Sequence, residues 1–265
     1  ELARAEVLFQ SVRYKEALAI AEAQWEATRK IQYRPVQADA AYEVGRILAD
    51  LVTGDEVERA EKLLREALDL SVRSRHDVRT AETWKSLVHL SARHHSNKQI
   101  GYLWAESALS AIERAGNDST LLASTLNEAG SLYAKAGRSD DAERMLRQAL
   151  DLEQKNRVDV LFQADTWQFL ANVSKDQGRF PEARKAFESA IQIIRDALGE
   201  GHPRLAFVKH DYAMFLHETG DFETGRKILT ESIDTWSKLY DPRHFRVGQA
   251  HIELAELERA LQGQR

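Results

Sequence analysis

The chain has 265 residues, of which 43% are hydrophobic and 30% are charged, a balance typical of soluble globular proteins. It has only 4 prolines and 13 glycines, which favours helix almost everywhere. The formal net charge of −5 argues against nucleic acid as the main ligand. The lack of cysteine excludes disulfides, thiol catalysis and Cys-ligated zinc, and it fits a reducing, cytoplasmic location.

The start of the sequence and its hydropathy bear on whether it is part of a longer protein and whether it enters a membrane. The sequence starts at Glu1 with neither an initiator methionine nor an apolar signal-like segment, so we expect a piece of a longer protein or a processed chain. A run of about 18 apolar residues, the length that a membrane-spanning helix needs, is absent from the sequence. The sequence therefore predicts no membrane interaction.

The sequence repeats itself with a spacing of 41 to 43 residues. Three columns of mostly small residues keep this spacing along the whole chain. The first column is Ala17, Ala60, Gly101, Ala142, Ala183 and Gly225; the second is Gln24, Ala67, Ala108, Ala149, Ala190 and Ser232; the third is Ala38, Ala81, Ala123, Ala164, Ala206 and Gly248. Such self-similarity is typical of repeat architectures.

Each repeat is predicted to form two helices joined by a short turn. Trp167, Leu170, Ala171 and Ser174 recur at helical spacing, and no stretch alternates with the period of a strand. We therefore expect an all-α protein, arranged as a single domain over residues 1–265. The expected repeats are 1–33, 34–77, 78–119, 120–160, 161–201 and 202–243, followed by a capping helix over 245–262.

Several motifs resemble the tetratricopeptide repeat. W-x-x-L-A at Trp167–Ala171, A-x-x-x-F at Ala183–Phe187 and G-x-x-Y at Gly130–Tyr133 match its pattern. The usual period is about 34 residues, so the longer period here is similar to that of kinesin light chains and of many bacterial signalling proteins. The stretch L-G-x-x-H-P-x-x-A at Leu198–Ala206 matches the turn that joins one such repeat to the next. The resemblance implies a right-handed α-solenoid of about six helical hairpins with a C-terminal capping helix.

The loop around His202 has two interpretations: a phosphate- or metal-binding loop, or a turn between repeats. As a turn, Gly199 ends one helix in a left-handed conformation and Pro203 begins the next. His202, which precedes proline, is then extended and able to cap or pack. Because the spacing belongs to the repeat, we favour the turn.

Other residues that look chemical also favour structural roles. His210 and His217 are two helical turns apart, too far for one metal ion, and His94 and His95 are expected to be solvated. The five tryptophans are expected to pack in the core. Neither a phosphate-binding glycine loop nor a hydrolase elbow occurs. The sequence therefore predicts no enzyme, no metal and no cofactor.

The resemblance implies that a ligand would bind in a concave groove lined by the first helix of each pair. The side chains expected to bind a partner there are Tyr42, Arg46, Lys85, His89, Arg93, Asn127, Glu128, Ser131, Gln168, Asn172, His210, Met214 and His217. Glu43 and Asp176 are expected to face the same way. The alternative is that many of these side chains are simply solvated. The family's clamp for a C-terminal carboxylate is not recognisable here.

The main hypothesis is a protein-interaction scaffold that binds a peptide or a partner domain in this groove. The alternative is a regulatory or sensor module of a larger bacterial signalling protein, such as a kinase or a transcription regulator, which responds to a peptide. On the first hypothesis, exchange of both Arg46 and Arg93 for glutamate should abolish partner binding without loss of helicity. The identity of the partner and the oligomeric state do not follow from the sequence.

Overall fold

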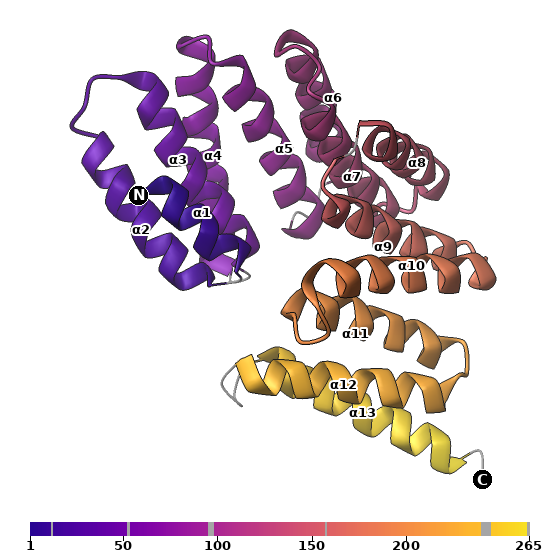
Figure 1. Cartoon of the computed structure of the whole chain (residues 1–265). Helices are drawn as coiled ribbons and strands as arrows, with labels where there is room; N and C mark the ends of the chain where they lie inside the picture. The colour runs from indigo at the N-terminus through magenta and orange to yellow at the C-terminus, as the bar shows by residue number, and fades with distance from the viewer. Residues whose placement is uncertain (12, 52–53, 95–97, 157, 240–244, 264–265) are drawn as a thin grey trace. The chain divides into compact units, whose positions relative to one another are not determined.

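The computed structural model describes residues 1–11, 13–51, 54–94, 98–156, 158–239 and 245–263, which contain thirteen α-helices and no strand (Figure 1). The helices divide into six pairs and one further helix. The first helices of the pairs are α1 (Leu2–Gln10), α3 (Arg34–Asp50), α5 (Asp77–His94), α7 (Ser119–Lys135), α9 (Val160–Asp176) and α11 (Pro203–Glu218). The second helices are α2 (Tyr14–Thr28), α4 (Gly54–Arg73), α6 (Lys98–Arg114), α8 (Ser139–Asn156), α10 (Phe180–Leu198) and α12 (Phe222–Leu239), and α13 (Phe245–Gly263) follows them. This confirms the all-α fold class and the expected hairpins.

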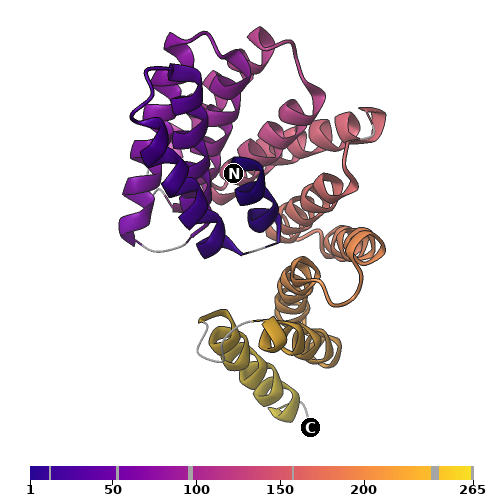
Figure 2. The same ribbon diagram turned by 60° about the vertical axis from the view of Figure 1, so that its left-hand side comes forward.

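The chain forms two compact units, Glu1–Leu152 (unit 1) and Glu153–Arg265 (unit 2), whose boundary falls within α8. In unit 1, α1 to α4 lie side by side, as the indigo and purple helices of Figures 1 and 2 show. In unit 2, α9 packs against α10 and α11 against α12. The single domain over residues 1–265 stays a prediction.

The columns of small residues mark the places where helices touch most closely. The alanines of all three columns are at most 1% exposed. A Cβ at Gly101 of α6 would lie 2.4 Å from the Ser91 hydroxyl of α5 and 2.8 Å from a methyl of Leu132 in α7, so no larger residue fits. Small residues thus allow the close backbone approach that the repeat requires. Gly248, at the end of the third column, has no atom within 4 Å of a Cβ position.

The turns within the hairpins use glycine for a conformational reason. Gly137, Gly178 and Gly220, which follow α7, α9 and α11, have φ angles of 75°, 72° and 84°. Residues with a side chain rarely adopt positive φ, so glycine is favoured where the chain leaves the first helix. The equivalent turn after α5, at residues 95–97, lies outside the described residues.

The loop after α10 is the joint between two hairpins, as predicted. Gly199 has a φ of 83°, and its ψ of 167° turns the chain away from the helix. His202 is extended, with φ −77° and ψ 134°, and its Nδ1 accepts a hydrogen bond of 3.1 Å from the backbone N–H of Arg204. Pro203 begins α11. His202 is therefore an N-cap, and burial together with the Arg204 charge lowers its pKa.

Candidate interaction surface

The side chains that the sequence analysis assigned to a groove lie along the first helices, and we refer to them as the first-helix stripe. In unit 1 they belong to α3, α5 and α7, and in unit 2 to α9 and α11. Tyr42, Asn127 and Ser131 are only 5%, 4% and 8% exposed. These three side chains therefore pack within unit 1 instead of presenting their surfaces to a ligand. Most of the others are half-buried, and Arg93 and Asp176 are exposed.

His89 connects three successive first helices of unit 1. Its Nε2 lies 3.1 Å from Asp50 of α3, and its Nδ1 lies 3.0 Å from Glu128 of α7. Arg93, one turn further along α5, forms a second ion pair of 2.7 Å with Asp50. Asp50 is thus shared by two cations, and His89 by two carboxylates.

The electrostatics of this cluster keep all of its members charged. Burial disfavours the imidazolium, yet the carboxylates of Glu128 and Asp50 raise the pKa of His89 to about 9. Burial likewise opposes ionisation of the two acids, but His89 and Arg93 lower the pKa of Asp50 and of Glu128. At neutral pH the cluster is a network of full charges between α3, α5 and α7.

Arg46 has a similar role between α1 and α3. It forms ion pairs with Glu6 of α1 and, at 2.6 Å, with Glu43 of its own helix. Its guanidinium carbon lies 4.2 Å from the centre of the Phe9 ring, a cation–π contact. The Arg46 side chain is only 16% exposed. A glutamate at this position would meet two carboxylates, so the expectation that the Arg46 and Arg93 double variant keeps its helicity does not fit the structure.

In unit 2 a hydrogen-bonded chain links α9, α11 and α13. The Gln168 amide donates to Asp211 at 2.6 Å, and Asp211 lies 3.3 Å from the imidazole of His210. The other ring nitrogen of His210 contacts Glu253 at 2.6 Å. Burial opposes the charge of His210, while the hydrogen bonds to Asp211 and Glu253 raise its pKa.

A second series of contacts uses equivalent positions of successive repeats. Arg79 of α5 pairs with Asp39 of α3 at 2.7 Å, and Arg204 of α11 pairs with Asp165 of α9. Arg246 of α13 lies 4.7 Å from the ring centre of Phe207, which replaces the acid. In both ion pairs the acid and the base are 39 or 40 residues apart, about one repeat. This spacing is visible in the sequence and would have predicted the pairs, but the groove prediction did not use it.

The rest of the stripe differs in its polar contacts. The side chains of Lys85 and Asn172 form no hydrogen bond or ion pair with the described part of the chain. Lys85 lies close enough to Glu128 to help lower the pKa of that acid. Met214 packs against the core of α12 and α13, and the ring of His217 lies 5.6 Å from that of Phe222.

The residues set aside as structural are mostly in the core. Trp25, Trp104 and Trp236 are at most 8% exposed, and the other two tryptophans pack partly buried against core clusters. His94 is not simply solvated, because its Nε2 lies 3.2 Å from the carbonyl oxygen of Ala49. His95 lies outside the described residues.

Clustered metal ligands and membrane-spanning helices are both absent from the described residues. They contain no group of three or more His, Asp or Glu side chains arranged to hold a metal ion. Nor does any helix in the described ranges combine the length and the hydropathy needed for a membrane crossing.

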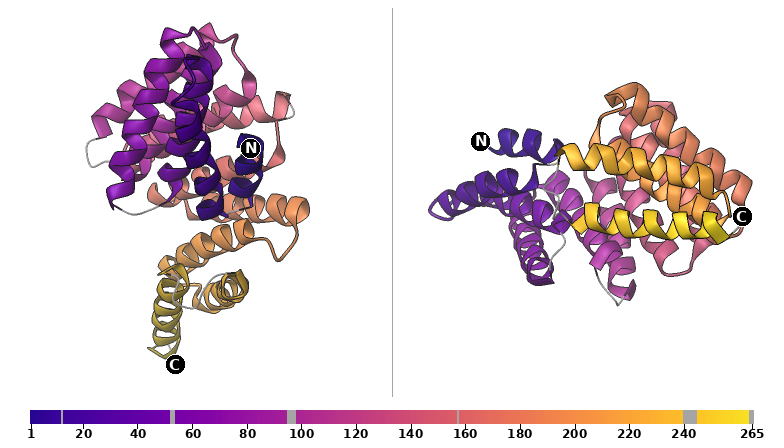
Figure 3. Two further views of the ribbon diagram at one scale, coloured as in Figure 1. Left: turned by 90° about the vertical axis from the view of Figure 1, so that its left-hand side faces the viewer. Right: turned by 90° about the horizontal axis from the view of Figure 1, so that it is seen from below.

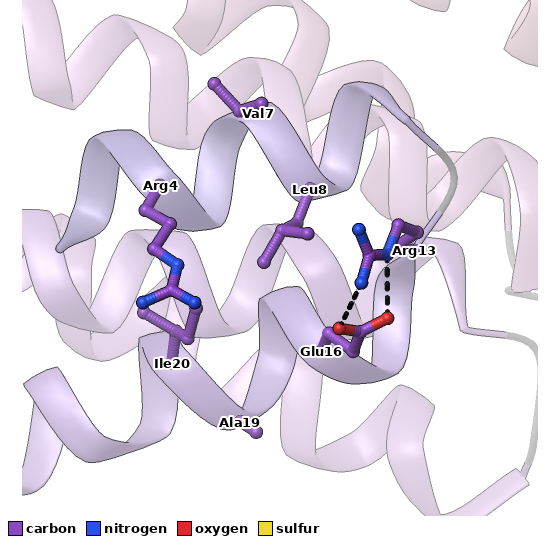
Figure 4. A pocket seen from close by; sticks show the side chains of 7 residues that line it. All are labelled: Arg4, Val7, Leu8, Arg13, Glu16, Ala19 and Ile20. Atoms are coloured by element: carbon purple, nitrogen blue, oxygen red, sulfur yellow. Dashed lines mark hydrogen bonds and ion pairs between the residues drawn. The ribbon is translucent and has the colours of Figure 1, made fainter.

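A shallow hollow lies between the first two helices of unit 1 (Figure 4). Its lining is Arg4, Val7 and Leu8 of α1 with Arg13, Glu16, Ala19 and Ile20 of the turn and α2. Arg13 and Glu16 close one side through an ion pair of 2.5 Å, and Val7 is 65% exposed. None of the buried polar atoms without a hydrogen bond in the described residues belongs to the lining of this hollow, so we do not assign it as a site.

Comparison with known proteins agrees with the helical hairpins. A family model described as Tetratricopeptide repeat matches residues 122–155 and 168–204. These residues cover most of α7 and α8, the second half of α9 and all of α10. No curated protein matches the chain.

Solved structures show the same fold at low sequence identity. BtubC (BKLC) from P. vanneervenii is 16% identical, with a TM-score of 0.52 over 94% of this chain and 84% of that one. A Rap protein complexed with Competence and Sporulation Factor is 12% identical, with a TM-score of 0.68 over 99% and 75%. A STAND signal-transduction ATPase with a tetratricopeptide repeat sensor, from Pyrococcus horikoshii, is 14% identical, with a TM-score of 0.61 over 99% of this chain and 43% of that one. Residues 122–155 and 168–204 thus match the tetratricopeptide repeat, and the chain has the all-α solenoid fold of these solved structures.

Proposed function

We propose that the chain is a protein-interaction module that binds a peptide or a segment of a partner protein along the first-helix stripe. One observation carries this proposal. Lys85 and Asn172 make no polar side-chain contact with the described residues, although their neighbours on the stripe are held by ion pairs and hydrogen bonds. The stripe therefore offers one polar group without a hydrogen bond or ion pair to the described residues in each unit, Lys85 in unit 1 and Asn172 in unit 2.

The chemistry of these groups suits a peptide. The Asn172 carboxamide can both donate to a carbonyl oxygen and accept from an N–H, the two groups that every peptide unit presents. The ammonium of Lys85 can donate three hydrogen bonds. Because the surrounding network already restricts the neighbouring side chains, less conformational entropy is lost on binding.

A second candidate function is a regulatory or sensor module of a larger signalling protein. The likeness in fold to a Rap protein in complex with a factor, and to a STAND protein with a repeat sensor, supports it. The chain spans 43% of the STAND protein, which has other parts besides its sensor. The absence of enzymatic activity and of a cofactor, the absence of a nucleic-acid ligand, and the cytoplasmic location belong to both proposals.

The test starts by capturing partners on the immobilised chain, identifying them by mass spectrometry and mapping the bound segment. Titration calorimetry with that segment then compares the chain with a Lys85→Glu and Asn172→Ala double variant. We expect affinity to fall at least tenfold while the circular dichroism spectrum is unchanged. Lys62→Glu with Ser189→Ala, on second helices, is the matched control and should bind normally. Equal affinity of the double variant would count against the stripe.

A further inference from the structure

Helix α13 packs on the rest of unit 2 through three buried side chains and the partly buried Leu254. Val247, Ala250 and Leu257 are its buried side chains within the described residues, whereas α11 buries eight. Figure 3 shows α12 and α13 lying side by side. The apolar face beneath α13 consists of Ala206, Phe207, Ala213, Met214, Leu229, Ile233 and Trp236, all on α11 and α12.

The opposite side of α13 carries little packing. Ile252 is 55% exposed, and a Cβ built at Gly248 would have no neighbouring atom within 4 Å. In the preceding repeats the alanines equivalent to Gly248 are at most 1% exposed. Within the described residues, the buried side chains of α13 belong to a cluster with α11 and α12.

Two polar contacts position α13 on this face. Glu253 meets His210 at 2.6 Å, and the two side chains are only 16% and 22% exposed. The guanidinium of Arg246 lies 4.7 Å from the ring centre of Phe207. A carboxylate opposite His210 is thus one of the contacts that a helix in this position can make.

The face beneath α13 also holds an unsatisfied donor. Trp236 is 2% exposed, and its indole N–H meets no hydrogen-bond acceptor in the described part of unit 2. A buried donor without an acceptor is unfavourable because its bond to water has been lost and not replaced. The apolar cluster shared by α11, α12 and α13 thus contains a donor for which none of them supplies an acceptor within the described residues.

We propose that α13 is a displaceable cap, and that an amphipathic helix of a partner protein replaces it on the α11 and α12 face. The replacing helix carries a carboxylate opposite His210 and a hydrogen-bond acceptor beside Trp236. The α11 and α12 face includes the stripe residue Met214 but neither Lys85 nor Asn172, so normal peptide binding by the Lys85 and Asn172 double variant would leave this proposal standing.

Hydrogen–deuterium exchange of the whole chain tests the first step, the opening of α13. We expect the amides of α13 to exchange at least tenfold faster than those of α11. Glu253→Gln should accelerate exchange in α13 at least threefold further, without changing α10. Equal protection of α13 and α11 would overturn the proposal.

A peptide of residues 245–263, labelled with a fluorophore, tests replacement. It should bind the full chain, and the same peptide with Glu253→Gln should bind at least tenfold more weakly. Because the chain has no other cysteine, Gly225→Cys with Leu257→Cys allows one defined disulfide between α12 and α13. A Cβ at Gly225 lies 3.5 Å from a methyl carbon of Leu257, which places the two positions in contact.

The oxidised double-cysteine chain should not bind the peptide, and reduction should restore binding. Binding by the oxidised chain, or no binding by the unmodified chain, would contradict displacement. Where the double-cysteine variant fails to fold, the exchange experiment on the unmodified chain decides the question.

Discussion

The two units join their first helices at the same repeat spacing but with different chemistry. In unit 1 the central contact is His89 between Asp50 and Glu128, with Arg93 as a second cation. In unit 2 the corresponding chain starts from the neutral amide of Gln168 and ends at the pair of His210 with Glu253. One repeat geometry thus accommodates networks of full charge and networks with neutral members.

The difference has an energetic consequence. A half-buried network of full charges is strongly destabilised when one member is removed, because the remaining charge loses its partner while it stays desolvated. A hydrogen-bonded network with a neutral donor loses less stability when one member is removed. Substitutions in the two networks should therefore lower the free energy of unfolding by different amounts.

The largest effect is expected for Arg46→Glu in unit 1. It places a third carboxylate beside Glu6 and Glu43 and removes the cation–π contact with Phe9. We expect a loss of roughly 3–5 kcal/mol in the free energy of unfolding, the range for broken buried ion pairs. Urea denaturation measures it. Arg29→Glu, at an exposed pair with Glu26, is the matched control and should cost less than about 1 kcal/mol.

A smaller and pH-dependent effect is expected for His89→Gln. The raised pKa of about 9 means that the stability due to His89 is fully present below its ordinary pKa of 6.5 and is lost as pH rises through 9. The lowered pKa values of Asp50 and Glu128 mean that their contribution is present above about pH 4 and is lost on acidification. We expect the variant to be about 2–3 kcal/mol less stable at pH 6.

Urea denaturation at pH 6, 8 and 10 checks this expectation, and the difference from the unmodified chain should shrink at pH 10. His210→Gln provides the comparison in unit 2 and should cost less at pH 6. A difference that does not vary with pH would show that His89 acts through packing alone.

The packing of the hairpins gives the next comparison. A Cβ at Gly130 of unit 1 would lie 2.7 Å from Leu146, whereas at Gly248 of unit 2 the space is open. We expect Gly130→Ala to lower the free energy of unfolding by about 1–2 kcal/mol through overpacking. Gly248→Ala should raise it by up to about 1 kcal/mol, because alanine favours helix. Equal effects would mean that Leu146 adjusts freely.

The smallest effect is expected for Lys175→Ala in unit 2. Its ion pair with Glu218 is 3.3 Å long, and the glutamate side chain is 55% exposed. Exposed pairs of this kind contribute about 0–1 kcal/mol. The thermal midpoint should stay within a few degrees of that of the unmodified chain. A large fall would indicate that exposed pairs between first helices matter as much as the buried ones.

The repeat spacing was enough to predict the hairpins, because the small-residue columns reflect a steric demand. Ala60, Ala142 and Ala183 lie where helices touch, and only small side chains fit there. The turn at Leu198–Ala206 was predictable for a similar reason, since its glycine, histidine and proline each have a local conformational role.

The first-helix stripe was predicted less well. Projection of a helix shows which way a side chain points but not how closely the neighbouring helix approaches. Tyr42, Asn127 and Ser131 were expected to face a ligand, yet they are at most 8% exposed. The ion pairs depend on contacts between repeats, which single-helix periodicity does not describe; the separation of Asp39 from Arg79 by one repeat would have indicated them.

The pairs between equivalent positions also affect how such a chain can change in length. Asp39 meets Arg79 one repeat later, and Asp165 meets Arg204 in the same way. Deletion of the repeat over residues 202–243 would bring Asp165 opposite Arg246, which stands one repeat after Arg204, whereas an insertion of a few residues within a first helix would break this register. This part of the chain is therefore suited to lose length by a whole repeat.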